Sequence, residues 1–456
     1  MSLERSQYSY RKLISLEDQL KRIDQFADEA QEKIDYAEAH NDEVLQGIRI
    51  VEDFLRRRGR ICYGGTAMNA YLPKKYKFYD PEASIPDYDF LTKDAAADLA
   101  ELEKDLRAEG FTEIAARPGM HDGTTKLFLN YIAIADLTEV DEGLYDIFKR
   151  KAKVLKGLTY MDINSLRMMM YLELSRPRGE VERWKKVYER LLLLQYVAPA
   201  AACSNKDYNE IKVAAPIYGS IFHYGLNHDR VFAGASVVEL YQRSTKGRVS
   251  ANRLEHSNFP IIFYSPSLEQ DAEHVSKLLG DTKDVLVQMI ESVGDYVPRM
   301  CVVKFAKRPI LLMVEETACH SFNTVQLGTN QHPVRIASLD LLVTLYFSLE
   351  LSPEKVLKKF FPMKIHCMAQ EAIDISNFLR RFPARSQWPF ISLDCSGHQK
   401  GFASLLREKF ERAAEAKRRR REKYMEDLSF SSSGTRSLKK SKKRSLNKTM
   451  KKSSKK

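Results

Sequence analysis

Three aspartates and a pair of glycines are the residues of this 456-residue chain whose types and spacing could do chemistry. Asp87 and Asp89 lie two residues apart in the segment SIPDYDF, so on a β-strand both carboxylates would leave the same face. Aspartate is unfavourable in strands, and two of them in a strand-like segment need a reason. We expect that reason to be a pair of divalent cations, because Mg²⁺ takes hard oxygen ligands and a carboxylate can bridge two ions.

The Gly64-Gly65 pair follows the strand-like residues 60–63 and precedes a short helix-compatible run that Pro73 closes. Thr66 is expected to cap that helix. Backbone N–H groups of such a turn at a helix N-terminus bind phosphate groups. The pattern therefore predicts a phosphoryl-transfer site in which Gly64, Gly65 and Thr66 hold the phosphates of a nucleotide.

Asp136 lies inside the mainly apolar run IAIADLTEV, residues 132–140. An unpaired buried carboxylate is costly, so an acid in a buried strand also needs a partner. A helix is predicted over residues 93–107, and strands over 111–117 and 125–131. This order indicates a mixed sheet with helices on one face, in which Asp136 lies beside Asp87 and Asp89.

The order Gly-Gly-Thr, DxD and a third Asp resembles the palm of the DNA polymerase β-like nucleotidyltransferase superfamily. Residues 165–194 resemble the helical stretch after the palm in the poly(A) polymerase catalytic subunits of large nucleocytoplasmic DNA viruses, most of all the mimivirus-like branch. The resemblance covers residues 45–345. It implies an α/β (α+β) fold: a polymerase β-like palm with a second, degenerate nucleotidyltransferase-like domain and flanking helices.

The resemblance implies a template-independent adenylyltransferase that adds AMP from ATP to the 3′ end of mRNA with two Mg²⁺ or Mn²⁺ ions. Asp87 and Asp89 would bind both ions, and Asp136 would share one and help deprotonate the attacking hydroxyl. The resemblance also implies a homodimer that acts in a cytoplasmic virus factory or in the virion. Two alternatives stay open: a tRNA- or small-molecule-directed nucleotidyltransferase with the same palm, and a non-catalytic RNA-binding or processivity subunit.

Several further residues are candidates for nucleotide contacts. Lys149, Arg150, Lys151 and Lys153 follow the palm, and Lys151 and Lys153 are the candidate triphosphate ligands, although solvated surface charges also fit. Tyr160 and Asn164 are candidate contacts of the base, but a packed tyrosine and a helix N-cap fit these positions better.

Internal similarity indicates a duplication, although chance similarity of two α/β segments is the alternative. Residues 230–241 echo residues 60–71, and residues 258–280 echo the DxD segment and its following helix. We align Phe232 with Tyr63 and Gly234 with Gly65. In this frame Ile261 and Phe263 replace Asp87 and Asp89, and Glu315 lies near the place of Asp136. The second copy therefore cannot hold two metal ions and is expected to supply a cleft wall or an RNA surface.

Six segments are expected. A packing helix with apolar residues at Leu16, Leu20, Ile23, Phe26 and Ile34 opens the chain. The segments are residues 1–59 (N-terminal helices), 60–160 (catalytic palm), 161–204 (helical linker), 205–345 (degenerate domain), 346–428 (C-terminal helices) and 429–456 (disordered basic tail).

Composition bounds the remaining expectations. Residues 431–456 hold 11 of the 73 Lys and Arg residues and no acid, and so nearly all of the net charge of +12. Such a tail, like the basic residues 418–421, attracts nucleic acid, but a solvated segment or a nuclear-import signal also fits. The six cysteines lack zinc-site spacing and predict free thiols in a reducing compartment. No signal peptide or membrane span is expected, so the predicted protein is soluble and intracellular.

Overall fold

The computed structural model describes residues 2–79, 85–86, 88–119, 123–199, 203, 212–247, 252–280, 282–327 and 333–401, with isolated positions from 404 to 418. Side chains are described from residue 16 onward. Asp87 and residues 419–456 lie outside the described residues. The chain divides into two compact units, Met1–Gln399 and Lys400–Lys456, and all features below belong to the first.

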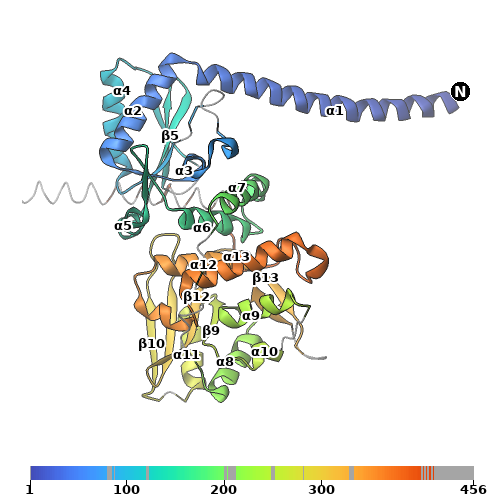
Figure 1. The fold of residues 1–456 in the computed structure, drawn as a ribbon, viewed down its shortest axis with the longest axis vertical. Coiled ribbons are helices and arrows are strands. Elements are labelled where there is room, and N and C mark those ends of the chain that lie inside the picture. Colours follow the sequence, from blue (N-terminus) through green and yellow to red (C-terminus); the bar gives the residue numbers. More distant parts are fainter. Residues whose placement is uncertain are drawn as a thin grey trace, which may run out of the picture. The chain divides into compact units, whose positions relative to one another are not determined.

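Seven strands of the first half form one mixed sheet in the order β3-β4-β5-β2-β1-β7-β6 (Figure 1). β2 and β5 are parallel neighbours, as are β1 and β7, and the other pairs are antiparallel. The strands are β1 Ile61–Cys62, β2 Asp89–Thr92, β3 Ile114–Pro118, β4 Thr124–Leu129, β5 Ile132–Glu139, β6 Lys153–Leu155 and β7 Leu158–Tyr160.

Two helices, α2 (Asp42–Arg58) and α4 (Ala95–Ala108), contact each other and β5. The Asn41 side chain caps α2, and left-handed Gly59 ends it. The apolar side of α2 is buried, so this helix supplies much of the core beneath the sheet. The buried residues of α2 are Val44, Gly47, Ile48, Val51, Phe54 and Leu55.

The first half also contains α3 Gly64–Tyr71, α5 Glu142–Lys151, α6 Ile163–Leu174 and α7 Trp184–Val197. The predicted cap at Thr66 is wrong, because α3 already begins at Gly64 and Tyr63 is its N-cap residue. The side chain of Asp162, rather than Asn164, caps α6. Short 3₁₀ helices cover Lys74–Tyr76, Val181–Arg183, Lys355–Phe360 and Pro383–Arg385.

A second sheet repeats the first strand by strand in the order β10-β11-β12-β9-β8-β14-β13, with β15 added at the edge (Figure 1). Each of the six shared neighbour pairs has the same direction in both sheets. The predicted second copy of the sheet is therefore confirmed by topology, while its predicted bounds, residues 205–345, stay a prediction. Its strands are β8 Val231–Ala233, β9 Ile261–Ser265, β10 Val285–Ile290, β11 Met300–Phe305, β12 Arg308–Glu315, β13 His320–Val325, β14 Val334–Ala337 and β15 Cys395–Ser396.

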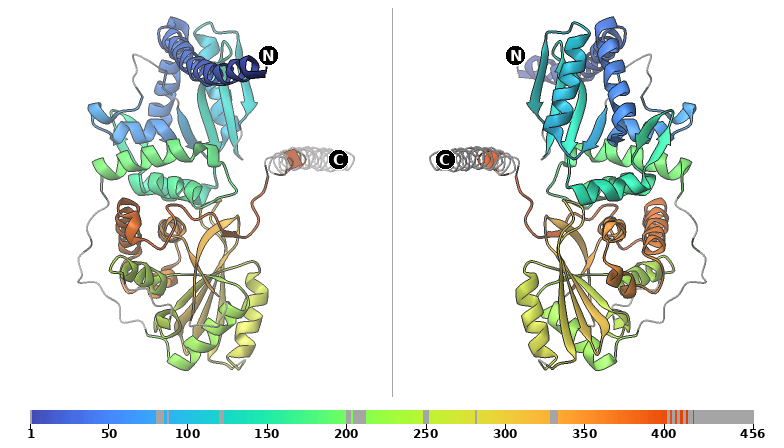
Figure 2. Two further views of the ribbon diagram at one scale, coloured as in Figure 1. Left: turned by 90° about the vertical axis from the view of Figure 1, so that its right-hand side faces the viewer. Right: turned by 90° about the vertical axis from the view of Figure 1, so that its left-hand side faces the viewer.

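The two halves pack against each other through helix α12 (Leu339–Leu351) and through the segment that connects β10 to β11. α12 is buried on nearly all sides and contacts both α6 and α13 (Figures 1 and 2). Tyr296, between β10 and β11, packs edge-on against Phe148 of α5 at 5.8 Å between ring centres. The helices of the second half are α8 Ala215–Asn227, α9 Ala235–Ser244, α10 Asn252–Glu255, α11 Leu268–Leu278, α12 Leu339–Leu351 and α13 Ile365–Arg381.

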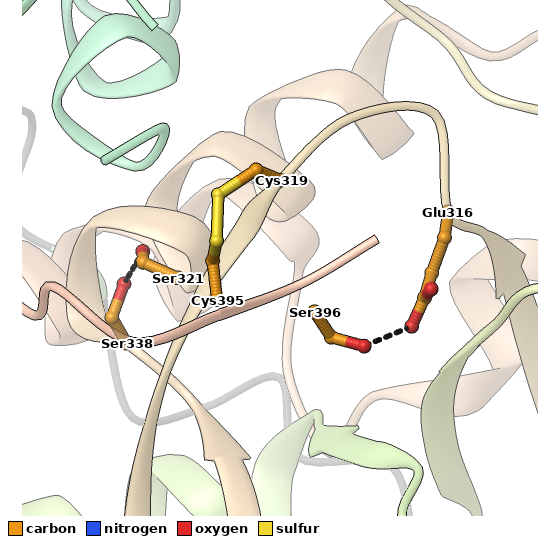
Figure 3. Close-up of a disulfide and its surroundings, with 6 residues drawn as sticks. All are labelled: Glu316, Cys319, Ser321, Ser338, Cys395 and Ser396. Atoms are coloured by element: carbon orange, nitrogen blue, oxygen red, sulfur yellow. Dashed lines mark hydrogen bonds between the residues drawn. A yellow bond between two sulfur atoms is a disulfide. The ribbon is translucent and has the colours of Figure 1, made fainter. Parts of the chain in front are cut away.

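Two disulfides contradict the prediction that all six cysteines are free thiols. Cys203 is bonded to Cys367, and Cys319 to Cys395. Figure 3 shows the second disulfide, which ties the start of β13 to β15 beside the hydrogen-bonded pairs Ser321–Ser338 and Ser396–Glu316. Cys62 and Cys301 are free and buried.

The first helix, α1 (Ser2–Ala39), does not pack as predicted. The five apolar side chains that define its predicted packing face, Leu16, Leu20, Ile23, Phe26 and Ile34, are 51–61% exposed. Within the described part of the chain, no helix is both long enough and apolar enough to span a bilayer.

Candidate active site

Asp89 and Asp136 are direct register partners on the parallel strands β2 and β5. Lys126 on β4 is in turn the partner of Asp136. Directly opposite residues project from the same face of a sheet, so the three side chains form one row across three strands. The prediction that Asp136 lies beside Asp89 is thus confirmed, whereas Asp87 lies outside the described residues.

The buried Asp136 carboxylate has a cationic partner. The Lys126 ammonium lies 2.6 Å from Oδ2 of Asp136, and the Lys126 side chain is 39% exposed. This position therefore attracts positive charge and is reached from the solvent. Two adjacent carboxylates are the donor type that Mg²⁺ and Mn²⁺ prefer, so Asp89 and Asp136 fit a divalent cation.

The glycine turn places the Asp89 carboxylate against the start of α3. Gly64 has φ +66°, and a Cβ there would lie 2.4 Å from Oδ2 of Asp89. The Tyr63 N–H also donates a hydrogen bond to the Asp89 carbonyl at 2.9 Å. Only glycine allows this approach, which brings a carboxylate beside the positive end of a helix dipole.

Tyr63 is a neutral neighbour of the acidic row. Its hydroxyl lies 2.8 Å from Oγ1 of Thr138 on β5. Burial raises the pKa of Tyr63 far above its ordinary value, and the nearby carboxylates of Asp89 and Asp136 raise it further. The phenol therefore stays protonated and acts as a hydrogen-bonding group rather than as a base.

Arg190 of α7 reaches the same glycine turn. Its Nη2 donates to the Tyr79 hydroxyl at 2.9 Å, and the guanidinium lies 4.5 Å from the centre of the Phe78 ring. A Cβ at Gly65 would lie 2.6 Å from the Tyr79 hydroxyl and 3.0 Å from Nη1 of Arg190. Sequence reasoning missed Arg190, although it lies in the helical stretch, residues 165–194, that carried part of the resemblance.

None of the lysines predicted to bind phosphate has a contact with the acidic row or the glycine turn among the contacts of the described residues. The Lys149 ammonium hydrogen-bonds to the Gly59 carbonyl. Lys153 pairs with Tyr160, which pairs with Cys62, so its side chain leaves the sheet on the face opposite Tyr63 and Asp89. The register therefore does not favour Lys153 as a phosphate ligand, and a role for Lys151, at the end of α5, stays a prediction.

The two predicted base contacts have structural partners. Tyr160 is buried in the core, and the Asn164 side-chain oxygen accepts a hydrogen bond from Nη1 of Arg167 at 2.7 Å. Their contact with a base stays a prediction. In the described residues, Cys203, His366 and Cys367 group as metal ligands would, but their two sulfurs are bonded to each other.

The second copy has lost the acidic row, although the predicted alignment is wrong by one residue. Gly234 has φ +88° and a Cβ there would lie 3.0 Å from the Ile262 side chain, so Gly234 matches Gly64 rather than Gly65. Ala233 pairs with Ile262, and Ile262 with Leu312. Ile262 and Leu312 therefore replace Asp89 and Asp136.

The register also corrects the other two assignments in that alignment. Phe263 is the next residue along β9, and Glu315 pairs with Ser265, three residues beyond Leu312. Neither occupies the position of an aspartate of the first copy. The inference that the second copy lacks the acidic ligands holds in the corrected frame.

A structural ion pair, in contrast, is present in both copies. Arg60 donates two hydrogen bonds to Asp98, at 2.6 and 2.7 Å. Arg230 does the same to Asp271, at 2.7 and 2.8 Å. In the first copy the pair joins the residue before β1 to α4, and in the second copy it joins the residue before β8 to α11. Because the second copy lacks the acidic row, the pair supports the fold and not the chemistry.

Comparison with known proteins agrees with this geometry. Residues 49–180 match the family model for the poly(A) polymerase catalytic subunit. A protein of that name from African swine fever virus (isolate Tick/Malawi/Lil 20-1/1983) is 24% identical over 240 residues, 50% of this chain and 47% of that protein. The chain thus matches about half the length of this relative. The corresponding protein of Acanthamoeba polyphaga mimivirus is 26% identical over 151 residues, 32% of this chain and 25% of that protein.

The crystal structure of the Megavirus polyadenylate synthase has the same fold. The superposition has a TM-score of 0.70 and covers 88% of this chain and 84% of the Megavirus chain. The two sequences are 16% identical. The nucleotidyltransferase fold predicted for this chain is therefore confirmed. Residues 49–180 are thus similar to the poly(A) polymerase catalytic subunit family, the family that the glycine and aspartate motifs resemble.

Proposed function

We propose that this chain is a template-independent polynucleotide adenylyltransferase that adds AMP from ATP to the 3′ end of RNA. The observation that carries the proposal is the pairing of Asp89 with Asp136 next to the Gly64 turn. Two carboxylates beside a glycine-formed helix start suit nucleotidyl transfer, and the related viral proteins bear the name poly(A) polymerase catalytic subunit.

In the reaction, the RNA 3′ oxygen bonds to the α-phosphorus of ATP, the bond to the bridging oxygen breaks, and pyrophosphate leaves. Asp87, Asp89 and Asp136 would hold two Mg²⁺ or Mn²⁺ ions. When bound, these ions lower the pKa of the attacking hydroxyl and offset charge on the transferred group. The N–H groups of Gly64 and Gly65 and the Thr66 hydroxyl lie at the start of α3, where they would orient the phosphates.

The test is incorporation of labelled AMP into an oligo(A) primer with each NTP and Mg²⁺ or Mn²⁺. Asp89→Asn and Asp136→Asn should lower the rate by about 100-fold or more without unfolding the chain. Asp53→Asn, which removes an exposed carboxylate from α2, should not. Wild-type activity in Asp89→Asn would reject the proposal.

The products separate the alternatives. ATP-dependent ladders support a poly(A) polymerase, and single additions point to a tRNA- or small-molecule-directed nucleotidyltransferase. An absence of product with any nucleotide points to a non-catalytic RNA-binding subunit. We also propose that the protein acts in the cytoplasmic virus factory or in the virion, which immunogold labelling of infected cells would test.

A homodimer is the second part of the proposal. The exposed apolar residues of α1 recur at alternating spacings of four and three, which is typical of a coiled-coil seam. In a parallel pair, Lys33 would face Glu38 of the partner subunit, so the charges suit a second copy of this chain. The residues of the seam are Leu16, Leu20, Ile23, Ala27, Ala30 and Ile34.

Light scattering of the full chain after size exclusion tests the dimer. Leu20→Asp together with Ile23→Asp should give monomers, because two charges would enter the apolar seam of each helix. Gln25→Asp places one such charge outside the seam and should leave the dimer intact. A wild-type monomer, or a dimer that survives the double substitution, would contradict this interface.

A further inference from the structure

Arg190 forms no ion pair with a carboxylate within the described part of the chain, although its charge acts on the partly buried Glu173 from a longer distance. The contacts of its guanidinium are the Tyr79 hydroxyl and the rings of Phe78 and Tyr79. Arg183, the residue just before α7, differs from Arg190. It pairs with Glu180 at 2.8 Å and with Glu173 at 3.4 Å. A half-buried arginine that is not engaged in an ion pair and lies beside a helix start is available to bind an anion.

The position of Arg190 is fixed by a chain of contacts that begins in α3 itself. The Asn69 side-chain oxygen accepts hydrogen bonds from the N–H groups of Phe78 and Tyr79, at 3.0 and 3.3 Å, and its amide donates to the Tyr79 carbonyl at 3.2 Å. The Phe78 ring and the Tyr79 hydroxyl then hold the guanidinium. The cation is therefore pre-oriented before any ligand arrives.

The same contacts set Arg190 against Gly65, whereas Asp89 lies against Gly64. Nη1 of Arg190 would lie 3.0 Å from a Cβ at Gly65, and Oδ2 of Asp89 2.4 Å from one at Gly64. The start of α3 therefore has a carboxylate beside Gly64 and a guanidinium cation beside Gly65. A triphosphate needs both: metal-binding carboxylates near the reacting phosphorus and fixed cations at the far phosphates.

We propose that Arg190 binds the terminal phosphates of the nucleoside triphosphate and the pyrophosphate that leaves. The Tyr79 hydroxyl, which accepts from Nη2, keeps its own proton to donate to a phosphate oxygen. This inference rests on the proposed function. It assigns the phosphate contact to a residue of α7 instead of the lysines at 149–153.

Binding of an α,β-methylene analogue of ATP, which cannot be cleaved at the reacting bond, tests the inference by calorimetry with Mn²⁺. Arg190→Ala should weaken binding of the analogue and of inorganic tripolyphosphate roughly 10- to 100-fold, the range expected for a hydrogen bond to a charged group. Binding of AMP, which lacks the terminal phosphates, should not change. Arg190→Lys should restore part of the loss, because it keeps the charge and loses the planar fork.

Lys185→Ala is the matched control, since it removes an exposed charge from the same helix and should bind all three ligands as the wild type does. Thermal unfolding of Arg190→Ala without ligand separates lost binding from lost fold. The inference is overturned if a folded Arg190→Ala binds the analogue as tightly as the wild type, or loses AMP binding equally. A wild-type chain that binds tripolyphosphate through Arg190 but not the ATP analogue would overturn the proposed function and leave the anion site standing. A wild-type chain that binds neither would overturn both.

Discussion

The two left-handed glycines that start α3 and α9 offer a matched pair of substitutions. Gly64 has φ +66° and Gly234 has φ +88°, and each lies between the central strand and the following helix of its sheet. The residues that they touch differ, because Gly64 abuts the Asp89 carboxylate and Gly234 abuts Ile262. Alanine at either position therefore strains the backbone, but the side chain that it displaces differs.

The expected size of each effect follows from the geometry. A non-glycine residue held at such a positive φ costs roughly 1–3 kcal/mol, and Gly234, with φ 88° and ψ −165°, lies in a region that is almost exclusive to glycine, so both variants should lose stability and Gly234→Ala at least as much as Gly64→Ala. A Cβ at Gly64 would lie 2.4 Å from Oδ2 of Asp89, about 1 Å closer than van der Waals contact allows, so the carboxylate must move by about that distance. A displacement of about 1 Å in a catalytic group can lower a rate by about 100-fold. At Gly234 the contact is 3.0 Å from an isoleucine methyl, which can shift without affecting the first sheet.

Urea unfolding of both variants measures the shared cost, and AMP incorporation into oligo(A) measures the difference. We expect Gly64→Ala to lose about 100-fold in rate and Gly234→Ala to stay within a few-fold of wild type at temperatures where both are folded. Wild-type activity of Gly64→Ala would refute the inferred approach of Asp89 to the turn. An equal loss of activity in Gly234→Ala would show that strain, not the position of Asp89, sets the rate.

Three further predictions concern stability. Asp271→Ala should cost about 3 kcal/mol in urea unfolding, because it removes the buried carboxylate that pairs with the partly buried Arg230 guanidinium, and a loss below about 1 kcal/mol would contradict a structural role for the pair. Burial lowers the pKa of His320 to about 3, so the unfolded chain binds a proton that the folded chain does not once the pH falls below about 6.5. Stability should therefore be lost as the pH falls from 6.5 toward 3, by about 2 kcal/mol at pH 5, and His320→Leu should remove this share of the pH dependence. Reduction of the Cys319–Cys395 disulfide, or Cys395→Ser, should lower stability by about 3 kcal/mol, and mass spectrometry of the unreduced chain should find the bond.

Sequence signals predicted the helix after the aspartate strand and the neighbourhood of two of the acidic residues. The helix predicted over residues 93–107 is α4, Ala95–Ala108, because helix propensity and capping act over a few neighbouring residues. Asp136 was placed beside Asp89 because an acid in an apolar strand needs a nearby partner, and the parallel pairing of β2 and β5 supplies it. The repeated order of elements likewise indicated the second sheet before its register was known.

Long-range features were missed for physical reasons. β9 is buried along its whole length, so its sequence has no alternation that could fix the register, and the alignment slipped by one residue. Arg190 meets Gly65 across more than a hundred residues, and no local pattern encodes that contact. The disulfides depend on the separation of chain segments in space, and the apolar spacing of α1 predicts a buried face without saying which chain covers it.

The two fully buried apolar residues that replace the acids also restrict how this protein can evolve. Ile262 and Leu312 have no exposed surface, so one aspartate at either position would be an unpaired charge in the core, at a cost of several kcal/mol. Chemistry could return to the second half only through simultaneous changes that add both acids and open a path to water. Single mutations are therefore expected to alter what the second half binds, while the capacity for reaction stays with the first.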